Sequence, residues 1–399
     1  MTSEIKQRIE RIRRGEVPER YVKTALGLAP ANWKRYTFGD IYTERKEPGD
    51  ENLPLLMVSI HSGVSDGEVD AAELPKQVKR IEDKSQYKKA VSGDLVFNMM
   101  RAWQGAIGTV RTTGMVSPAY IVAEPNDKAY PLFMDYYSRT PQMINQIDRQ
   151  SYGVTDFRKR LYWDSFAPIG CILPPIAEQR KIAAILTTQD KVIELKEKRL
   201  AEKQRQKKYL MQQLLTGKKR LPGFIGKWKT FGFNEIFITI STKGHQINKA
   251  EYETKGRYPV IDQGRQMIAG YSNKAEKALM CPKEGVIVFG DHTREIKFVN
   301  FDFIVGADGT QLLSAKSKNA AIKYLFYYLS NKDIHSDGYS RHFKYVKEFT
   351  YRLPPLGEQT AIAEVLSAAD HEIDLLQQDI EQEKQKKKAL MQLLLTGIV

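Results

Sequence analysis

Apolar side chains recur at alternating steps of four and three over about 40 residues at the end of the chain, the pattern of a helix with one apolar seam. The same seam occurs 180 residues earlier, and polar side chains interrupt it in both places. Pro-Pro precedes each stretch and Gly follows its last apolar residues, as at the two ends of a helix. Two long helices are therefore predicted, within residues 173–219 and 353–399. The positions expected to pair them are Ile182, Leu186, Ile193, Leu200, Leu210, Leu214, Ile362, Leu366, Ile373, Leu376, Ile380, Leu390 and Leu394.

The regions before the two helices contain short runs of β-branched and aromatic residues separated by glycine, as in the strands of a compact sheet. The clearest runs are residues 95–99, 106–110, 286–289 and 301–305. Residues 1–172 and 220–352 are each long enough to bury a core of their own. We expect each region to be an α+β domain with one or two helices.

The two helical stretches are copies of one another. Leu173–Gly217 and Leu353–Gly397 share 20 identities over 45 residues with no gap. The preceding domains are related more loosely: each opens at a Trp-Lys pair, at Trp33 and Trp228, and the stretches between their matching segments have diverged. The chain is therefore a tandem duplication in the order domain, helix, domain, helix. The expected boundaries are 1–172, 173–219, 220–352 and 353–399.

The two helices differ in net charge. Residues 173–219 hold 12 basic and 5 acidic side chains, a net of +7, whereas residues 353–399 hold 4 and 8, a net of −4. Opposite charge favours pairing of the two helices with each other and disfavours pairing of like copies. Two paired helices of about 38 residues would form a rod roughly 57 Å long, at about 1.5 Å per residue. The alternative is that each helix packs only on its own domain.

A basic excess in the composition indicates a polyanionic partner, with solubility conferred by charge as the alternative. The net charge of +14 is concentrated in the second domain, with 21 basic and 13 acidic residues, and in the first helix. Two cysteines, Cys171 and Cys281, without CxxC spacing argue against a disulfide framework or a zinc site. No apolar run approaches 18 residues and the N-terminus lacks a signal-peptide pattern. We expect a cytoplasmic protein with no membrane partner.

The diverged stretches of both domains hold clusters of Arg, Lys, Gln, His and Trp beside glycine. In the major groove, Arg and Lys can donate to guanine O6 and N7, and Gln can bond adenine N6 and N7. Glycine lets a backbone approach a ligand closely. The alternative for any single member is a solvated loop. The candidates for base readout are Lys46, Arg101, Trp103, Gln104, Lys243, His245, Gln263, Arg265, Gln266, His292 and Arg294.

A basic and aromatic segment lies just before each Pro-Pro. Its cations would contact phosphates and position the domain on DNA without reading sequence. The alternative is an edge strand whose aromatic side chains pack on the base of the helix. The candidates for DNA-backbone contact are Arg158, Lys159, Arg160, Arg341 and Lys344.

The motifs of nucleotide and base chemistry are missing from the sequence. It has no GxxxxGK[ST] phosphate loop, and Pro-Pro never occurs in the Asn-Pro-Pro-aromatic or Asp-Pro-Pro-aromatic motif of adenine methyltransferases. Glu295-Ile-Lys297, near Asp291, imitates the end of a nuclease site, but acid-x-Lys triplets also occur at 194–196 and 253–255. We expect no catalytic residue, no metal site and no bound cofactor, with a single-chain nuclease as one alternative.

Two copies of Leu-Pro-Pro-x-x-Glu-Gln-x-x-Ile-Ala, each leading to Leu-Met-Gln-x-Leu-Leu-Thr-Gly, carry a resemblance that spans all 399 residues. The chain resembles the specificity subunits of type I restriction-modification enzymes. That resemblance implies two target recognition domains, each reading one half of a split DNA sequence, with the paired helices as the spacer between them. It also implies that the subunit itself does no chemistry.

The resemblance further implies a set of partners for a role in DNA methylation and host defence. These are double-stranded DNA, two modification subunits that methylate adenine with S-adenosylmethionine, and restriction subunits that use ATP and Mg to translocate and cut DNA. The expected fold is α+β, with two tandem α/β target recognition domains separated by two long helices that pair as an antiparallel coiled coil, in a pseudo-twofold circular arrangement. A second alternative function is a coiled-coil protein that tethers DNA without reading its sequence.

The first 26 residues contain a short amphipathic helical pattern that ends at Gly15. This segment precedes Trp33 as residues 214–217 precede Trp228. We therefore expect it to continue the end of the C-terminal helix and close a circular arrangement. The alternative is a flexible basic tail.

Overall fold

The computed structural model describes residues 3–50, 52–60, 63–65, 86–153, 159–316, 320–336, 338 and 340–398. The chain forms two compact units, which we call the first unit (residues 1–195 and 380–399) and the second unit (residues 196–379). Each unit contains one domain and part of each long helix. None of the described helices combines the length and apolar character that a membrane span requires.

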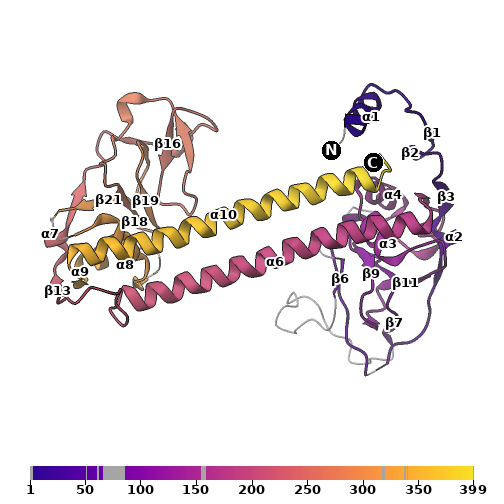
Figure 1. Ribbon diagram of the computed structural model, residues 1–399, viewed down its shortest axis with the longest axis horizontal. Coiled ribbons are helices and arrows are strands. Elements are labelled where there is room, and N and C mark those ends of the chain that lie inside the picture. The colour runs from indigo at the N-terminus through magenta and orange to yellow at the C-terminus, as the bar shows by residue number, and fades with distance from the viewer. Residues whose placement is uncertain are drawn as a thin grey trace. The chain divides into compact units, whose positions relative to one another are not determined.

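The two long helices are α6 (Ile176–Leu214) and α10 (Leu356–Leu394), with 39 residues each (Figure 1). Each begins directly after Pro-Pro, where proline fixes φ at a position that needs no intrahelical donor. Each is followed by a glycine in the left-handed region, Gly217 at φ 74° and Gly397 at φ 68°. A left-handed residue cannot continue a right-handed helix, so these glycines end both copies in the same way.

Polar side chains of α6 and α10 pair with each other in both units, and in the second unit the basic ones belong to α6 and the acidic ones to α10. In the second unit residue numbers rise along α6 as they fall along α10, so the helices pack antiparallel, as expected. The contacts are Gln189 with Glu383 (2.6 Å) and Asp190 with Lys387 (2.5 Å) in the first unit, and Lys196 with Asp379 (2.8 Å) and Lys203 with Glu372 (2.9 Å) in the second.

Reversing one of these charges tests whether the charge pattern supports helix pairing. Glu372→Lys is expected to lower the melting temperature at low salt, because it would place a cation beside Lys203 and Arg199, which now pair with Glu372. Lys203, with help from Arg199, lowers the pKa of Glu372. Adding Lys203→Glu should restore part of the loss, and high salt should narrow the difference. Equal melting of the single and double variants at both salt concentrations would contradict this role.

The ends of both helices also pack into the domain cores. Ile182 of α6 and Leu394 of α10 belong to the core of the first domain. Leu214 of α6, with Ile362 and Leu366 of α10, belongs to the core of the second. The alternative in which each helix packs only on its own domain is therefore wrong, because each domain core receives the end of one long helix and the beginning of the other.

A four-stranded antiparallel sheet, in the order β4-β11-β8-β9, forms the centre of the first domain. In a separate two-stranded sheet, β3, which follows Trp33, pairs antiparallel with β12, the last strand of the domain. The strands are β1 (Tyr21–Thr24), β2 (Gly27–Pro30), β3 (Lys34–Thr37), β4 (Tyr42–Glu44), β5 (Val58–Ser59), β6 (Gly63–Val64), β7 (Lys88–Ala90), β8 (Leu95–Asn98), β9 (Ile107–Thr109), β10 (Gly114–Val116), β11 (Tyr120–Pro125) and β12 (Gly170–Leu173). The helices are α1 (Ser3–Arg13), α2 (Phe38–Ile41), η2 (Ala102–Gln104), α3 (Pro131–Tyr137), α4 (Pro141–Gln150) and α5 (Trp163–Phe166).

The second domain repeats this plan, with a sheet in the order β14-β21-β18-β19 and a first-to-last strand pair, β13 with β22. A second sheet, β15-β20-β16-β17, joins it, with β20 parallel to both β15 and β16. The strands are β13 (Lys229–Phe231), β14 (Phe237–Ile240), β15 (Gln246–Ile247), β16 (Tyr258–Ile261), β17 (Gly270–Ser272), β18 (Val286–Gly290), β19 (Ile296–Val299), β20 (Ile304–Gly306), β21 (Thr310–Ala315) and β22 (Tyr351–Leu353). The helices are α7 (Phe233–Ile236), η4 (Lys249–Glu251), η5 (Ala275–Lys277), α8 (Ile322–Ser330) and α9 (Phe343–Glu348). The expected α+β class is confirmed.

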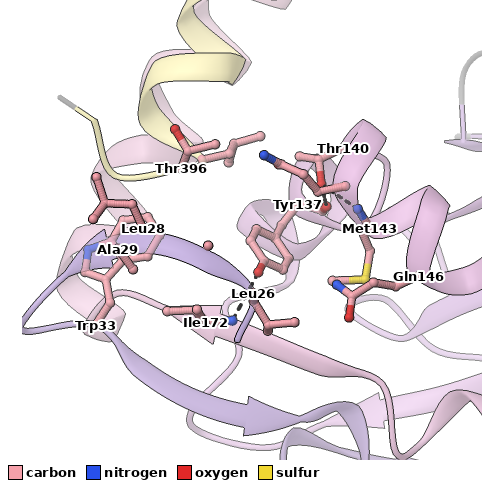
Figure 2. Close-up of a pocket in the computed structure, with 13 residues that line it drawn as sticks. Leu26, Leu28, Ala29, Trp33, Tyr137, Thr140, Met143, Gln146, Ile172 and Thr396 are labelled. Atoms are coloured by element: carbon pink, nitrogen blue, oxygen red, sulfur yellow. Dashed lines mark hydrogen bonds between the residues drawn. The ribbon is translucent and has the colours of Figure 1, made fainter. Parts of the chain in front are cut away.

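The two ends of the chain meet in the first unit (Figure 1). The Arg8 guanidinium donates to the carbonyl of Ile398 at 3.1 Å, and the Tyr21 hydroxyl donates to that of Gly397 at 2.6 Å. Figure 2 shows Leu28, Ala29 and Trp33 near Thr396, around a cavity of about 100 Å³. Residues 3–30 are therefore not a free tail. They hold the C-terminal end of α10, although α1 is a separate helix and does not continue it.

Candidate nucleic-acid interface

The same connection in each domain carries candidate base-reading residues. Because the two four-stranded sheets have the same order, the β8–β9 connection (residues 99–106) and the β18–β19 connection (residues 291–295) occupy equivalent places. The first contains Arg101, Trp103 and Gln104, and the second contains His292 and Arg294. The sequence alone aligns these domains at their matching segments and does not align these two connections.

Three connections of the second domain meet at one edge, and we call them the three-loop cluster: residues 262–269, 291–295 and 307–309. β16 and β20 run parallel, so the residues that follow them emerge at the same edge. Gly290 pairs with Thr310, which brings the start of the β18–β19 connection to the residue that follows 307–309. Every loop of the cluster is thus tied to its neighbours by strand register.

Hydrogen bonds join the loops of this cluster directly. The backbone N–H of His292 donates to Gln263 Oε1 at 3.2 Å, and the hydroxyl of Thr293 donates to the carbonyl of Gln263 at 2.5 Å. The Cβ position of Gly309 lies only 2.8 Å from His292 Cδ2, so a side chain at Gly309 would displace the His292 ring or the Gln263 amide beside it. The candidates Gln263, Arg265, Gln266, His292 and Arg294 therefore lie within one connected cluster.

Lys243 and His245 lie elsewhere in the same domain. They precede β15, and β15 runs parallel to β20, so they emerge at the edge opposite the three-loop cluster. There His245 Nδ1 lies 3.2 Å from the carbonyl of Lys277. Lys243 and His245 therefore lie outside the three-loop cluster, and their role in base readout stays a prediction.

The two arginines of the three-loop cluster differ in what they can offer a ligand. Arg265 projects into solvent, with 93% of its side chain exposed and one ion pair of 3.5 Å to Glu295. Arg294 has a left-handed backbone, φ 63°, and donates from Nη1 to the carbonyl of Ile334 at 2.9 Å. Arg265 has the freer guanidinium, so it is the better placed of the two for bidentate contact with a guanine.

In the first domain the candidate residues surround the short helix η2. Arg101 and Gln104 are exposed, while Trp103 is half-buried and donates from Nε1 to the carbonyl of Met100 at 3.0 Å. The Lys159 ammonium lies 5.3 Å from the centre of the Trp103 ring and pairs with Asp148 at 2.8 Å. Lys159 is thereby brought next to the readout candidates of its domain. An ammonium over an indole face is also a cation–π contact, which fixes the ring.

Lys46 follows β4 at the same end of the sheet as the β8–β9 connection. β4 pairs with β11 and β11 pairs with β8, and Tyr120 at the start of β11 lies opposite Asn98 at the end of β8. Lys46 is largely exposed and pairs with Glu44 at 3.2 Å. Lys46 therefore lies at the same end of the sheet as Arg101, Trp103 and Gln104.

The segments expected to contact the DNA backbone are only partly exposed. Arg158 lies outside the described residues, and Arg160 is exposed on a backbone bridge to Tyr152. Arg341 and Lys344 are exposed at the start of α9. Phe343 between them is buried, with its ring centroid 5.7 Å from those of Phe233 and Phe289.

The alternative prediction was that each of these segments is an edge strand. In the second domain this secondary structure is wrong. The residues that follow Arg341 form the helix α9. It is right that an aromatic side chain packs into the domain, because Phe343 sits in its core. A helix allows one side chain to be buried and its neighbour exposed, because only residues three and four positions apart share a face. Phe343 can therefore pack in the core while Lys344 points to solvent.

The nuclease alternative depends on Lys297, whose ammonium is already occupied. It donates to the carbonyls of Asp262 at 2.7 Å and Gln266 at 2.6 Å. The described part of the chain contains no group of three His, Cys, Asp or Glu side chains that could hold a metal ion. In the sequence, Lys297 belongs only to the acid-x-Lys pattern, and the one signal that distinguishes it is a lysine within the otherwise apolar strand β19.

Comparisons with known proteins agree with the motif of the long helices. Residues 225–385 match the family described as type I restriction modification DNA specificity domain. A putative type I restriction enzyme MjaX specificity subunit from Methanocaldococcus jannaschii is 25% identical over 95% of this chain and 96% of its own length. The type I restriction enzyme EcoR124I/EcoR124II specificity subunit from Escherichia coli is 27% identical over 28% of each chain.

A solved structure shares the fold. It is a type I restriction-modification system S subunit from M. genitalium, with a TM-score of 0.62 at 13% identity, covering 91% of this chain and 96% of that one. At this identity the likeness concerns the fold alone. The matched domain and the relatives in sequence show that the chain is similar to the specificity subunits of type I restriction-modification systems.

Proposed function

We propose that this chain recognises a bipartite, asymmetric site on duplex DNA, with one domain reading each half, and that it does no chemistry itself. The observation that carries this proposal is the equivalent placement of two unlike connections, residues 99–106 and 291–295, on two sheets of the same strand order. Equivalent placement suits the same task in both domains. Different side chains in the same place suit different base sequences.

We further propose that two modification subunits and restriction subunits assemble on this chain. The two copies of the helix share 20 of 45 residues, including both ends, and a repeated surface of this kind suits two copies of one partner. S-adenosylmethionine, ATP and Mg would then be bound by those partners and would supply methyl transfer, translocation and cleavage. This chain would supply DNA recognition and the scaffold.

Methylation sequencing of host DNA, with and without the gene for this chain, tests the proposal. The expected result is a bipartite adenine-methylated motif that disappears on deletion. A single-chain nuclease would instead cut DNA alone with magnesium, and a tethering protein would bind random duplexes with equal affinity in competition. Equal affinity for all duplexes would overturn the proposal.

Salt dependence should separate backbone contact from base readout. Arg341→Ala with Lys344→Ala is expected to weaken binding to all sequences alike, and to reduce the slope of log affinity against log salt by about 2, roughly 0.9 for each lost phosphate contact. Arg341 lies just before α9 and Lys344 in its first turn, and both side chains are exposed, so the change leaves the core unaltered. The measurement is a DNA-binding titration at several salt concentrations on matched and scrambled duplexes. A loss confined to one base sequence would reassign these residues to base readout.

A further inference from the structure

Lys297 is a buried cation that contacts the 262–269 loop of the three-loop cluster. It lies on β19, opposite Val288 of β18, and only 7% of it is exposed. Burial lowers the pKa of its ammonium from the ordinary lysine value, while the nearby Asp262 carboxylate opposes that shift. A buried ammonium is costly unless its donors are satisfied. A lysine at this position therefore needs a structural reason.

The partners of the ammonium supply that reason. Its two hydrogen bonds go to the carbonyls of Asp262 and Gln266, and Asp262 Oδ1 lies 3.8 Å away, an ion-pair contact beyond hydrogen-bond distance. The two carbonyls accept from two of the three N–H donors of the ammonium, and the carboxylate balances its charge. The two carbonyls stand at either end of the segment Gln263-Gly264-Arg265. One side chain thus closes a five-residue loop, 262–266, at both ends.

The closed loop is also fixed internally and to its neighbour. The backbone N–H of Gly264 donates to Asp262 Oδ1 at 2.8 Å, which turns the chain sharply at the loop tip. Gln263 accepts two hydrogen bonds from the β18–β19 connection, as described above. The exposed Arg265 side chain therefore projects from a loop whose backbone has little freedom. A recognition side chain discriminates bases well only when its backbone is held in place.

We infer that Lys297 is a positioning residue for DNA recognition by the second domain, acting through the carbonyls of Asp262 and Gln266 to hold the loop that presents Gln263 and Arg265. This inference rests on the proposed function, because it assigns the three-loop cluster to one half of the DNA site. It contrasts with the catalytic role that the Glu295-x-Lys297 pattern imitates. In this role Lys297 contacts no base itself. It determines where Gln263 and Arg265, the residues that would contact bases, are placed.

The test compares Lys297→Met with Lys297→Arg in the full chain assembled with its methyltransferase partner. The measurement is methylation of a duplex library in which each half-site is randomised in turn. Methionine keeps the length and the apolar stem but leaves both carbonyls without a donor, whereas arginine keeps charge and donors. We expect Lys297→Met to lose about tenfold in discrimination at one half-site, with the other half-site unchanged, and Lys297→Arg to recover part of that loss.

Lys316→Met is the matched control. Lys316 also donates from its ammonium to a backbone carbonyl, that of Asn234 at 2.8 Å, but it is exposed and lies outside the three-loop cluster. It should leave both base preferences intact. Unchanged preferences in Lys297→Met, or equal loss at both half-sites, would overturn the inference. A wild-type complex without any base preference would instead refute the proposed function itself.

Backbone amide exchange keeps the inference testable if Lys297→Met does not fold. In Lys297→Arg, the amides of Gly264 and Arg265 are expected to exchange several times faster than in the wild type, while those of β18 and β21 exchange at the wild-type rate. The same preparation is assayed on the randomised library. Faster exchange in the loop with undiminished discrimination would separate loop order from recognition and overturn the inference.

Discussion

Replacing Arg265 with alanine is expected to weaken recognition of one half-site by roughly 5- to 150-fold, the range of about 1–3 kcal/mol for a bidentate arginine contact to guanine. Its side chain is 93% exposed and its one ion pair is long, so the substitution removes a recognition group without disturbing the core. The measurement is affinity for duplexes altered in one half-site at a time. The other half-site should retain its preference.

Arg257→Ala provides a matched control for that prediction. Arg257 is an exposed arginine of the same domain, but it lies just before β16, at the end of the strand opposite Arg265. Arg294→Ala is expected to have a smaller direct effect than Arg265→Ala, because the Arg294 guanidinium is already engaged with the carbonyl of Ile334. If Arg265→Ala weakens binding to matched and scrambled DNA equally, Arg265 contacts phosphate and reads no base.

Gly397→Ala is expected to destabilise the first unit by about 2–5 kcal/mol. A left-handed backbone at φ 68° costs an alanine about 1–2 kcal/mol. A Cβ atom at this position would also lie 2.5 Å from Pro30 Cδ and 3.0 Å from the Trp33 ring, and overpacking of this kind typically costs about 1–3 kcal/mol. Thermal or denaturant unfolding, followed in the first unit, provides the measurement.

Gly217→Ala is the internal control, since it is the same residue of the duplicated motif. Its φ angle is 74°, and the nearest atom to a Cβ there is Trp228 Cζ2 at 3.2 Å. Gly217→Ala should cost only about 1–2 kcal/mol, for the left-handed alanine backbone, because its Cβ would overlap little with neighbouring atoms. The two substitutions differ in expected cost because Gly397 packs directly against Pro30 of the N-terminal segment. Equal destabilisation by the two substitutions would mean that the N-terminal segment does not hold the C-terminal end in solution.

The long helices could be predicted from the sequence because their determinants are local. Pro-Pro, the apolar seam and the final glycine all act within one segment, and the observed helices begin and end at these signals. The strand runs were also found, with small differences: residues 95–99 correspond to β8, Leu95–Asn98, and residues 301–305 to β20, Ile304–Gly306. Hydrophobic and aromatic content marks a strand, but its ends depend on the partner strand.

The grouping of candidate residues could not be predicted, because it depends on which strands pair. Lys243 and His245 resemble Gln263 and Arg265 in composition, yet the parallel pairing of β15 and β16 with β20 sends them to opposite edges. The left-handed φ of Arg294 and the hydrogen bonds of Lys297 likewise arise from contacts with distant segments. Residue type indicated what could bind DNA, and tertiary pairing determines which of these residues lie together.

The pairing of β3 with β12 and of β13 with β22 has a consequence for how the coding sequence of such a chain can change over generations. Because β3 lies beside β12, and β13 beside β22, the chain enters and leaves the body of each domain at one place. Everything between those two strands can be exchanged as a single block of coding sequence without moving the junctions. If each domain reads one half of a DNA site, as proposed, a recombination event confined to one block would give one new half-site and leave the other domain and the long helices as they were.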